Sequence, residues 1–309
     1  MPKGASNADG SQPFWTVPVI GAMSPQEAAP KLVALGYGDV AKGLEFSKVD
    51  RLVFANLGWG STKPLWIQTS HEFGFIPPLS TTASDAFEVT NAADATPDIG
   101  LIGSKVKISL GRLNAFSYPG SGNHQVLLQF SAQNQLAKGA QQLQFVQTYR
   151  ISQGGQAGVE GYPIFVGLRV GSEGLSFKCA TVNIKNEDDQ RLLSFLDSDA
   201  FKAGLKLVDA LNPAIPLVAA FAEGLATSLL KRHDNVKVQN VELGLDFSNT
   251  AFGPKLAEGS YIAVQKDEAK NWDWSEWVYN RKNGQVVSKE DGTRGMPNNY
   301  LIFNVSRMV

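Results

Sequence analysis

Between residues 44 and 183 short apolar runs alternate with turn-forming residues, and this pattern constrains the fold more than any other feature of the chain. Gly, Pro, Ser and Asn separate the runs, and the spacing of an amphipathic helix is absent. Runs at intervals of about 8–12 residues are typical of a β-sandwich or a jelly roll. The strands expected here are residues 51–57, 65–69, 86–90, 105–110, 124–131, 142–151, 165–170 and 176–184.

The same pattern returns near the C-terminus, where Asn283-Gly284 predicts a tight hairpin. We therefore predict a mainly β protein, an antiparallel β-sandwich of the jelly-roll or C2-like kind. The additional strands expected are residues 236–245, 260–265, 276–279, 286–288 and 300–305.

Helix signals occur in two places. Ser24-Pro25-Gln26-Glu27 reads as a capping box with proline at the first helical position, so an N-terminal helix should begin there. Two further helices are expected as an insertion at about 187–232, where cap residues precede apolar positions at helical spacing. Residues 1–12 read as a disordered tail, and 13–309 as a single β-rich domain.

The charge balance excludes several partners. Lys and Arg number 28 and Asp and Glu 29, so the formal charge is 28 − 29 = −1, and charged residues are only 18% of the chain. Binding to duplex nucleic acid requires a basic surface, and a polybasic membrane anchor requires clustered lysines. A chain with this charge balance is therefore expected to bind no nucleic acid and to have no polybasic membrane anchor. With no apolar signal segment and a single cysteine, Cys179, we expect a cytoplasmic location, with release by a leaderless route left open.

No catalytic constellation is visible. The three histidines, His71, His124 and His233, are far apart and share no metal-binding spacing. Ser121 lies in a Gly-Ser-Gly turn rather than a nucleophile elbow, and Cys179 lies in an apolar run typical of a buried thiol. We therefore expect no enzyme, no cofactor and no metal. The acids between 187 and 199 could hold calcium, but helix capping explains them better.

Trp272, Trp274 and Trp277 form the densest aromatic cluster. In an extended segment the three indoles would share one face and could stack on a sugar or receive an apolar partner. Asp273 and Glu276 place acid within the cluster, which disfavours stacking on nucleic acid bases. The other interpretation is that the indoles close the core under the following hairpin.

The charges are segregated along the chain. Residues 64–104 contain five acids and no Lys or Arg, whereas residues 99–159 contain no acid and carry ten glutamines between 125 and 156. Segment 123–152 reads as a β-hairpin connected through 135–141, with one apolar face and one polar, almost uncharged face. Such a face suits recognition of a protein or glycan, an ordinary solvent-facing hairpin, or the lumen of a membrane pore.

We therefore expect a non-catalytic recognition protein that binds a protein or glycan partner. The alternative is a β-hairpin pore-forming or membrane-acting toxin or effector that uses residues 123–152, and only this alternative involves a membrane. A homo-oligomer is among the expected forms. The candidate binding residues are Trp272, Trp274, Trp277, Tyr149, Arg150 and Gln144, and the membrane-inserting residues of the alternative are Val126, Leu128, Phe130, Leu143 and Phe145.

Overall fold

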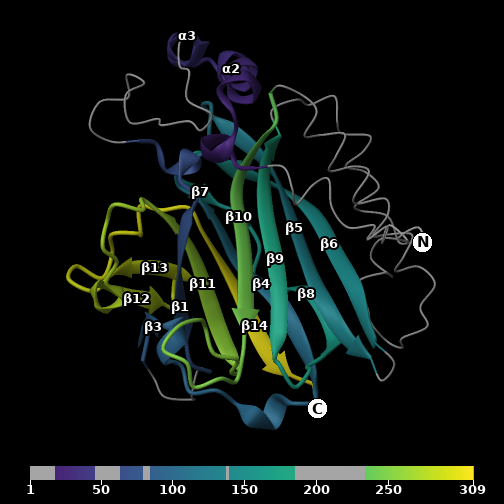
Figure 1. Ribbon diagram of the computed structural model, residues 1–309. Coiled ribbons are helices and arrows are strands. Elements are labelled where there is room, and N and C mark those ends of the chain that lie inside the picture. Colours follow the sequence, from purple (N-terminus) through teal and green to yellow (C-terminus); the bar gives the residue numbers. More distant parts are fainter. Residues whose placement is uncertain (1–17, 46–62, 79–83, 137–138, 185–233, 309) are drawn as a thin grey trace, which may run out of the picture.

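The computed structural model describes residues 18–45, 63–78, 84–136, 139–184 and 234–308 (Figure 1). These residues form a mainly β, sandwich-like fold with antiparallel sheets, as the sequence pattern predicts. The expected tail at 1–12, the strand at 51–57, the helices at 187–232 and the acids considered for calcium lie outside the described residues.

The N-terminal helix is confirmed. A 3-10 turn, η1 (Ile20–Ala22), precedes α2 (Pro25–Ala34), and the predicted capping box is formed. The Ser24 hydroxyl accepts from the Glu27 amide at 3.4 Å, while the Glu27 carboxylate accepts from the Ser24 amide at 3.0 Å. A second helix, α3 (Gly38–Glu45), follows directly and was not expected from the sequence.

The largest sheet is seven-stranded, with the order β3-β1-β11-β14-β4-β7 and with β8 also pairing β4. All its pairings are antiparallel. Its strands are β1 (Ser70–Ile76), β3 (Thr90–Asn91), β4 (Lys105–Ala115), β7 (Gly155–Gln156), β8 (Tyr162–Arg169), β11 (Gly259–Lys266) and β14 (Tyr300–Arg307).

Two smaller antiparallel sheets accompany it. The four-stranded sheet has the order β10-β9-β5-β6, and the three-stranded sheet has the order β13-β12-β2. The strands of the first are β5 (Asn123–Leu136), β6 (Gly139–Ser152), β9 (Leu175–Ile184) and β10 (Val236–Leu245). The strands of the second are β2 (Ala86–Glu88), β12 (Trp277–Asn280) and β13 (Gln285–Ser288).

Alternation along the central strands divides the core in two. Tyr261 and Phe303, on β11 and β14, stack at 5.4 Å and belong to the main core shared with the four-stranded sheet. Their neighbours Ile262 and Ile302 belong to a second, smaller core with residues of the three-stranded sheet. Because successive side chains of a strand point to opposite faces, the seven-stranded sheet is the middle of three layers.

The strand expected at 65–69 is wrong. Leu65–Ile67 forms a 3-10 turn, η3, and β1 begins only at Ser70. Trp66 and Ile67 are consecutive and both buried, which a tight turn permits and a strand with one solvent face does not. The hairpin connection is also shorter than expected, because β5 extends to Leu136 and β6 starts at Gly139.

Candidate functional site

The clearest candidate site is a cavity of about 340 Å³ beside the loop that joins β11 to β12. We call it the Trp272 cavity. Its size falls within the range of small-molecule pockets, about 300–1,000 Å³. The lining residues are Lys63, Leu65, Lys266, Asp267, Lys270, Asn271, Trp272, Asp273, Glu276, Trp277, Pro297 and Asn298.

Trp274 fixes this loop to the middle sheet. Its side chain is buried in the smaller core, and β1 leaves room for it at Gly74. A Cβ atom added to Gly74 would lie 2.8 Å from Cη2 of Trp274 and 2.7 Å from Cγ1 of Val89. The indole therefore occupies space that only a glycine leaves open.

The two other indoles form the aromatic wall of the cavity. Trp272 and Trp277 are half-buried and stacked, with ring centroids 6.1 Å apart and an interplanar angle of 11°. Trp272 also meets the buried Trp274 edge-to-face at 5.3 Å. Trp272 is therefore held in position by Trp274, whose ring is part of the smaller core.

The extended Trp row predicted from the sequence is wrong in its backbone. Trp274–Glu276 forms a 3-10 turn, η8, and only Trp277 begins a strand. Asp273 caps the turn, because its carboxylate accepts from the Ser275 amide at 2.8 Å. Hydrogen bonds from the Ser275 side chain and from its amide lower the pKa of Asp273. Because of this turn the three side chains do not share one face: Trp274 packs in the smaller core, whereas Trp272 and Trp277 line the cavity.

Polar groups of balanced charge complete the lining. Three lysines, Lys63, Lys266 and Lys270, stand against three carboxylates, Asp267, Asp273 and Glu276. Lys266 is held in place by Glu72 of β1, with Nζ 3.0 Å from Oε1, and it also donates to the Lys270 carbonyl at 3.0 Å. A lining without net charge favours a neutral, hydroxyl-rich ligand over a polyanion or polycation.

The polar face of the 123–152 hairpin is not the open surface that the sequence suggests. Gln129 and Gln144 are buried, and Nε2 of Gln129 donates to Oε1 of Gln144 at 3.0 Å. Tyr149 and Arg150 do not form a joint contact, because adjacent residues of a strand face opposite ways. Tyr149 packs against the main core, where burial raises the pKa of its hydroxyl, and Arg150 is exposed.

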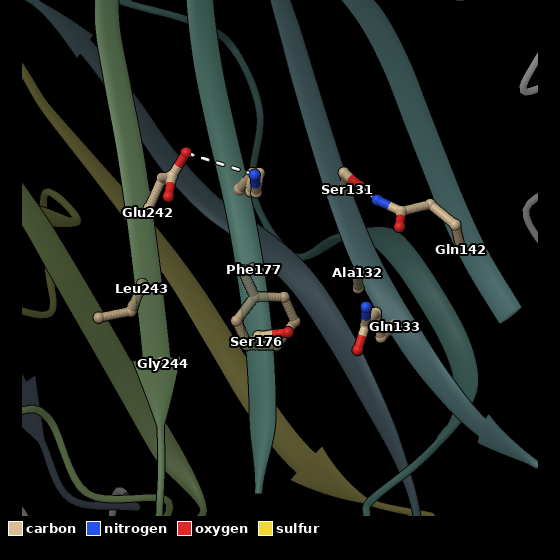
Figure 2. Close-up of a pocket in the computed structure, with 10 residues that line it drawn as sticks. Ser131, Ala132, Gln133, Gln142, Ser176, Phe177, Glu242, Leu243 and Gly244 are labelled. Carbon is tan, nitrogen blue, oxygen red and sulfur yellow. Dashed lines mark hydrogen bonds and ion pairs between the residues drawn. The ribbon is translucent and has the colours of Figure 1, made fainter. Parts of the chain in front are cut away.

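A polar groove of about 360 Å³ opens on the four-stranded sheet beside Gln144, whose cross-strand partner Ser131 lines it (Figure 2). On one wall Gln142 donates to the Ser131 hydroxyl at 2.6 Å, and on the other Nζ of Lys178 lies 3.4 Å from Glu242. These groups satisfy one another, and Phe177, the aromatic residue of the groove lining, is buried. It lies on the four-stranded sheet, away from the three-stranded layer that carries the tryptophans.

The residues of the membrane alternative all lie inside the protein. Val126, Leu128 and Phe130 of β5 are buried in the main core, and so are Leu143 and Phe145 of β6. Phe130 meets Phe303 of the middle sheet at 6.2 Å, edge to face. Exposing this apolar face to lipid would require the two large sheets to separate. Within the described residues, no helix is long and apolar enough to cross a membrane.

The remaining reactive groups are buried and scattered. Cys179 is a buried thiol of β9, as predicted, and burial raises its pKa well above the ordinary value. His124 lies at the start of β5, and burial lowers its pKa. In the described ranges no three His, Cys, Asp or Glu side chains come together as metal ligands.

His71 predicts a pH dependence of stability. Burial lowers its pKa to about 4, from 6.5 in a model peptide, so the folded protein keeps His71 neutral. As the pH falls from 6.5 towards 4, His71 becomes protonated in the unfolded chain but stays neutral in the folded protein. The unfolded state is therefore stabilised relative to the folded state, and stability that is present above pH 6.5 is lost. The loss is of the order of 3 kcal/mol.

His71→Gln removes this titration. Urea unfolding of the variant should therefore show a smaller loss of stability between about pH 7 and pH 4.5 than the native chain does. His124 contributes in the same direction in both proteins, so the difference between them isolates His71. Superimposable pH profiles would contradict this role of His71.

The sequence did not identify the polar residues of the Trp272 cavity. Asp267 and Lys270 lie in a turn in which the Lys270 amide donates to the Asp267 carbonyl at 3.1 Å. Asn298 comes from the segment before β14, and its Nδ2 donates to the Gln265 carbonyl at 3.0 Å. Cross-strand pairing brings these segments together, and long-range pairing leaves no local signal in the sequence.

Comparison of the chain with protein-family models, curated proteins and solved structures gives no match in any of the three.

Proposed function

We propose that the protein is a non-catalytic recognition module that binds a glycan in the Trp272 cavity. The observation that carries the proposal is the stacked pair Trp272 and Trp277, which walls a cavity otherwise lined by amides and charged groups of balanced sign. Pyranose rings present an apolar C–H face and a rim of hydroxyls. An indole ring can stack on the apolar C–H face, and amide and carboxylate oxygens can accept hydrogen bonds from the hydroxyls.

The anchoring of the wall supports this proposal. Trp272 is held between the buried Trp274 and the half-buried Trp277, so little side-chain entropy is lost when a ligand stacks against it. Asn298 is likewise fixed by its bond to the Gln265 carbonyl. Preorganised side chains of this kind increase affinity without adding contacts.

A glycan array probed with the labelled full chain tests the proposal. The native protein should bind a defined subset of neutral glycans, and Trp272→Ala should lower the affinity at least about tenfold, because it removes a stacking surface. Trp272→Phe, which keeps a ring, should retain part of the binding.

Phe252→Ala serves as the matched control, because Phe252 is 86% exposed and lies outside the cavity lining. Binding by Phe252→Ala should equal that of the native protein. An empty array, or full binding by Trp272→Ala, would overturn the proposal. Capture of a protein instead of a glycan would also contradict it.

A further inference from the structure

Four large apolar side chains are exposed at one end of the molecule, the lower end in Figure 1, where β14 finishes and the C-terminus lies. Among the described residues, only Val33 and Phe116 are large, apolar and exposed elsewhere. Isolated apolar residues are ordinary on a protein surface, but a group of them marks a contact site. We call the four residues the Ile99 surface; they are Ile99 of the 3-10 turn η5 (Ile99–Leu101), Ile102, Phe252 of the β10–β11 loop and Met308.

Hydrogen bonds hold the loops of the Ile99 surface in place. The Arg307 guanidinium donates to the Gly100 carbonyl at 2.8 Å and to the Asp98 carboxylate at 3.0 Å, which fixes η5 to the end of β14. The Asp98 amide donates to the Leu256 carbonyl at 2.8 Å, which joins η5 to the β10–β11 loop. Ile99 is nevertheless 70% exposed. The surface is thus preorganised, and a partner that binds it loses little affinity to the ordering of loops.

Three exposed cations border this surface. Lys105 of β4 lies directly opposite Arg169 of β8, and Lys107 follows on the same face of β4. The Lys105 carbonyl accepts from the Met308 amide at 2.9 Å, and the Arg169 guanidinium donates to the Gly103 carbonyl at 3.3 Å, just after the apolar loop. Among the described residues, no carboxylate forms an ion pair with any of the three cations.

The placement of these cations is unfavourable for the protein alone. Like charges directly opposite each other on neighbouring strands are destabilising, which applies to Lys105 and Arg169. Two carboxylates of the same end, Asp98 and Glu258, are instead engaged by Arg307, at 3.0 and 3.3 Å. An anionic partner would offset the repulsion, whereas a second copy of this surface would increase it. The overall charge of −1 conceals this local excess of positive charge.

We propose that the Ile99 surface docks on an anionic phospholipid bilayer, with its apolar side chains in the interfacial layer and the three cations at the lipid phosphates. A bilayer offers an apolar layer directly beneath anionic headgroups, which matches apolar residues bordered by cations. The Trp272 cavity would then face away from the membrane. Its lining residue Lys266 ends β11, whereas the first residue of that strand, Gly259, pairs with Val305 at the end of β14 near the surface.

Cosedimentation of the full chain with sucrose-loaded vesicles tests this proposal. The native chain should sediment with vesicles of phosphatidylserine and phosphatidylcholine, dissociate as the ionic strength rises, and stay in solution with phosphatidylcholine alone. Lys105→Gln and Arg169→Gln should each lower the partition coefficient about fivefold. Ile99→Ser should lower it about tenfold, because less apolar area is inserted. Lys105→Gln also relieves a like-charge pair, so its unfolding midpoint in urea should not fall, and weaker binding cannot reflect a lost fold.

Two exposed residues outside this surface supply matched controls. Val33→Ser removes an apolar side chain of α2, Arg150→Gln removes a cation of β6, and both variants should bind the vesicles as the native chain does. Trp272→Ala should also bind them, so that failure here and failure of glycan binding are separate results. A native chain that stays in solution with anionic vesicles at low ionic strength would overturn the proposal. Unchanged binding by Ile99→Ser and Lys105→Gln would do the same, and so would binding to polyglutamate but not to vesicles, which would assign the surface to an acidic protein.

Discussion

Gly74→Val should destabilise the protein by about 3 kcal/mol and abolish binding at the Trp272 cavity. A Cβ atom at this position would lie 2.7 Å from Val89 and 2.8 and 2.9 Å from two carbons of the Trp274 ring. Since Trp274 is buried against the middle sheet, it has no room to move aside without opening the smaller core. Its displacement also removes the support of Trp272, which meets it at 5.3 Å.

Gly244→Val is the matched control, because Gly244 is also a strand glycine but has open space around its Cα. Urea unfolding should show a change well below that of Gly74→Val, and binding should be unaffected. Equal stability changes for the two variants would show that loss of glycine in a strand, and not the Trp274 contact, sets the cost.

Asn299→Leu should cost about 3 kcal/mol of unfolding free energy, although it keeps the side-chain volume nearly constant. Asn299 is fully buried and joins two segments, since its amide nitrogen donates to the Ser117 carbonyl at 2.7 Å and to Gln265 at 2.8 Å. Its oxygen accepts from the Ser117 amide at 2.8 Å. Leucine would leave all three partners without a bond in a buried site.

Asn123→Ala controls for the loss of an amide side chain, because Asn123 is exposed and, among the described residues, its oxygen accepts only from the Ser152 hydroxyl, at 3.0 Å. Its unfolding midpoint in urea should stay near that of the native chain. If Asn299→Leu were equally mild, the buried amides would not be a structural link between the β4–β5 connection and the middle sheet.

Local signals in the sequence were sufficient for much of the fold. The strand expected at 236–245 matches β10 to the residue, and the Asn283-Gly284 turn joins β12 to β13. The Ser24 capping box works because its partners are three residues apart. The strand predicted at residues 65–69 was wrong because a short apolar run in the sequence is compatible with either a strand or a buried turn, and only the tertiary packing of Trp66 distinguishes the two.

The candidate site was only partly predictable. The tryptophans were conspicuous in the sequence, yet the turn at Asp273 that divides them between core and cavity depends on one side-chain hydrogen bond. Gln144 looked like a surface residue because the alternation of β6 marks its face as polar. The structure buries it and pairs it with Gln129, a pairing that requires the β5–β6 register. Long-range pairing of this kind carries no local signal.

The most direct test of the central claim is a titration of the labelled protein with a neutral glycan selected on the array, followed through the indole N–H signals in a proton–nitrogen correlation spectrum. The six tryptophans of the chain serve as internal reporters. Binding in the cavity should shift the signals of Trp272 and Trp277 with a common dissociation constant and leave Trp66, buried in the main core, unchanged. A saturable shift elsewhere with Trp272 and Trp277 unmoved would contradict the account.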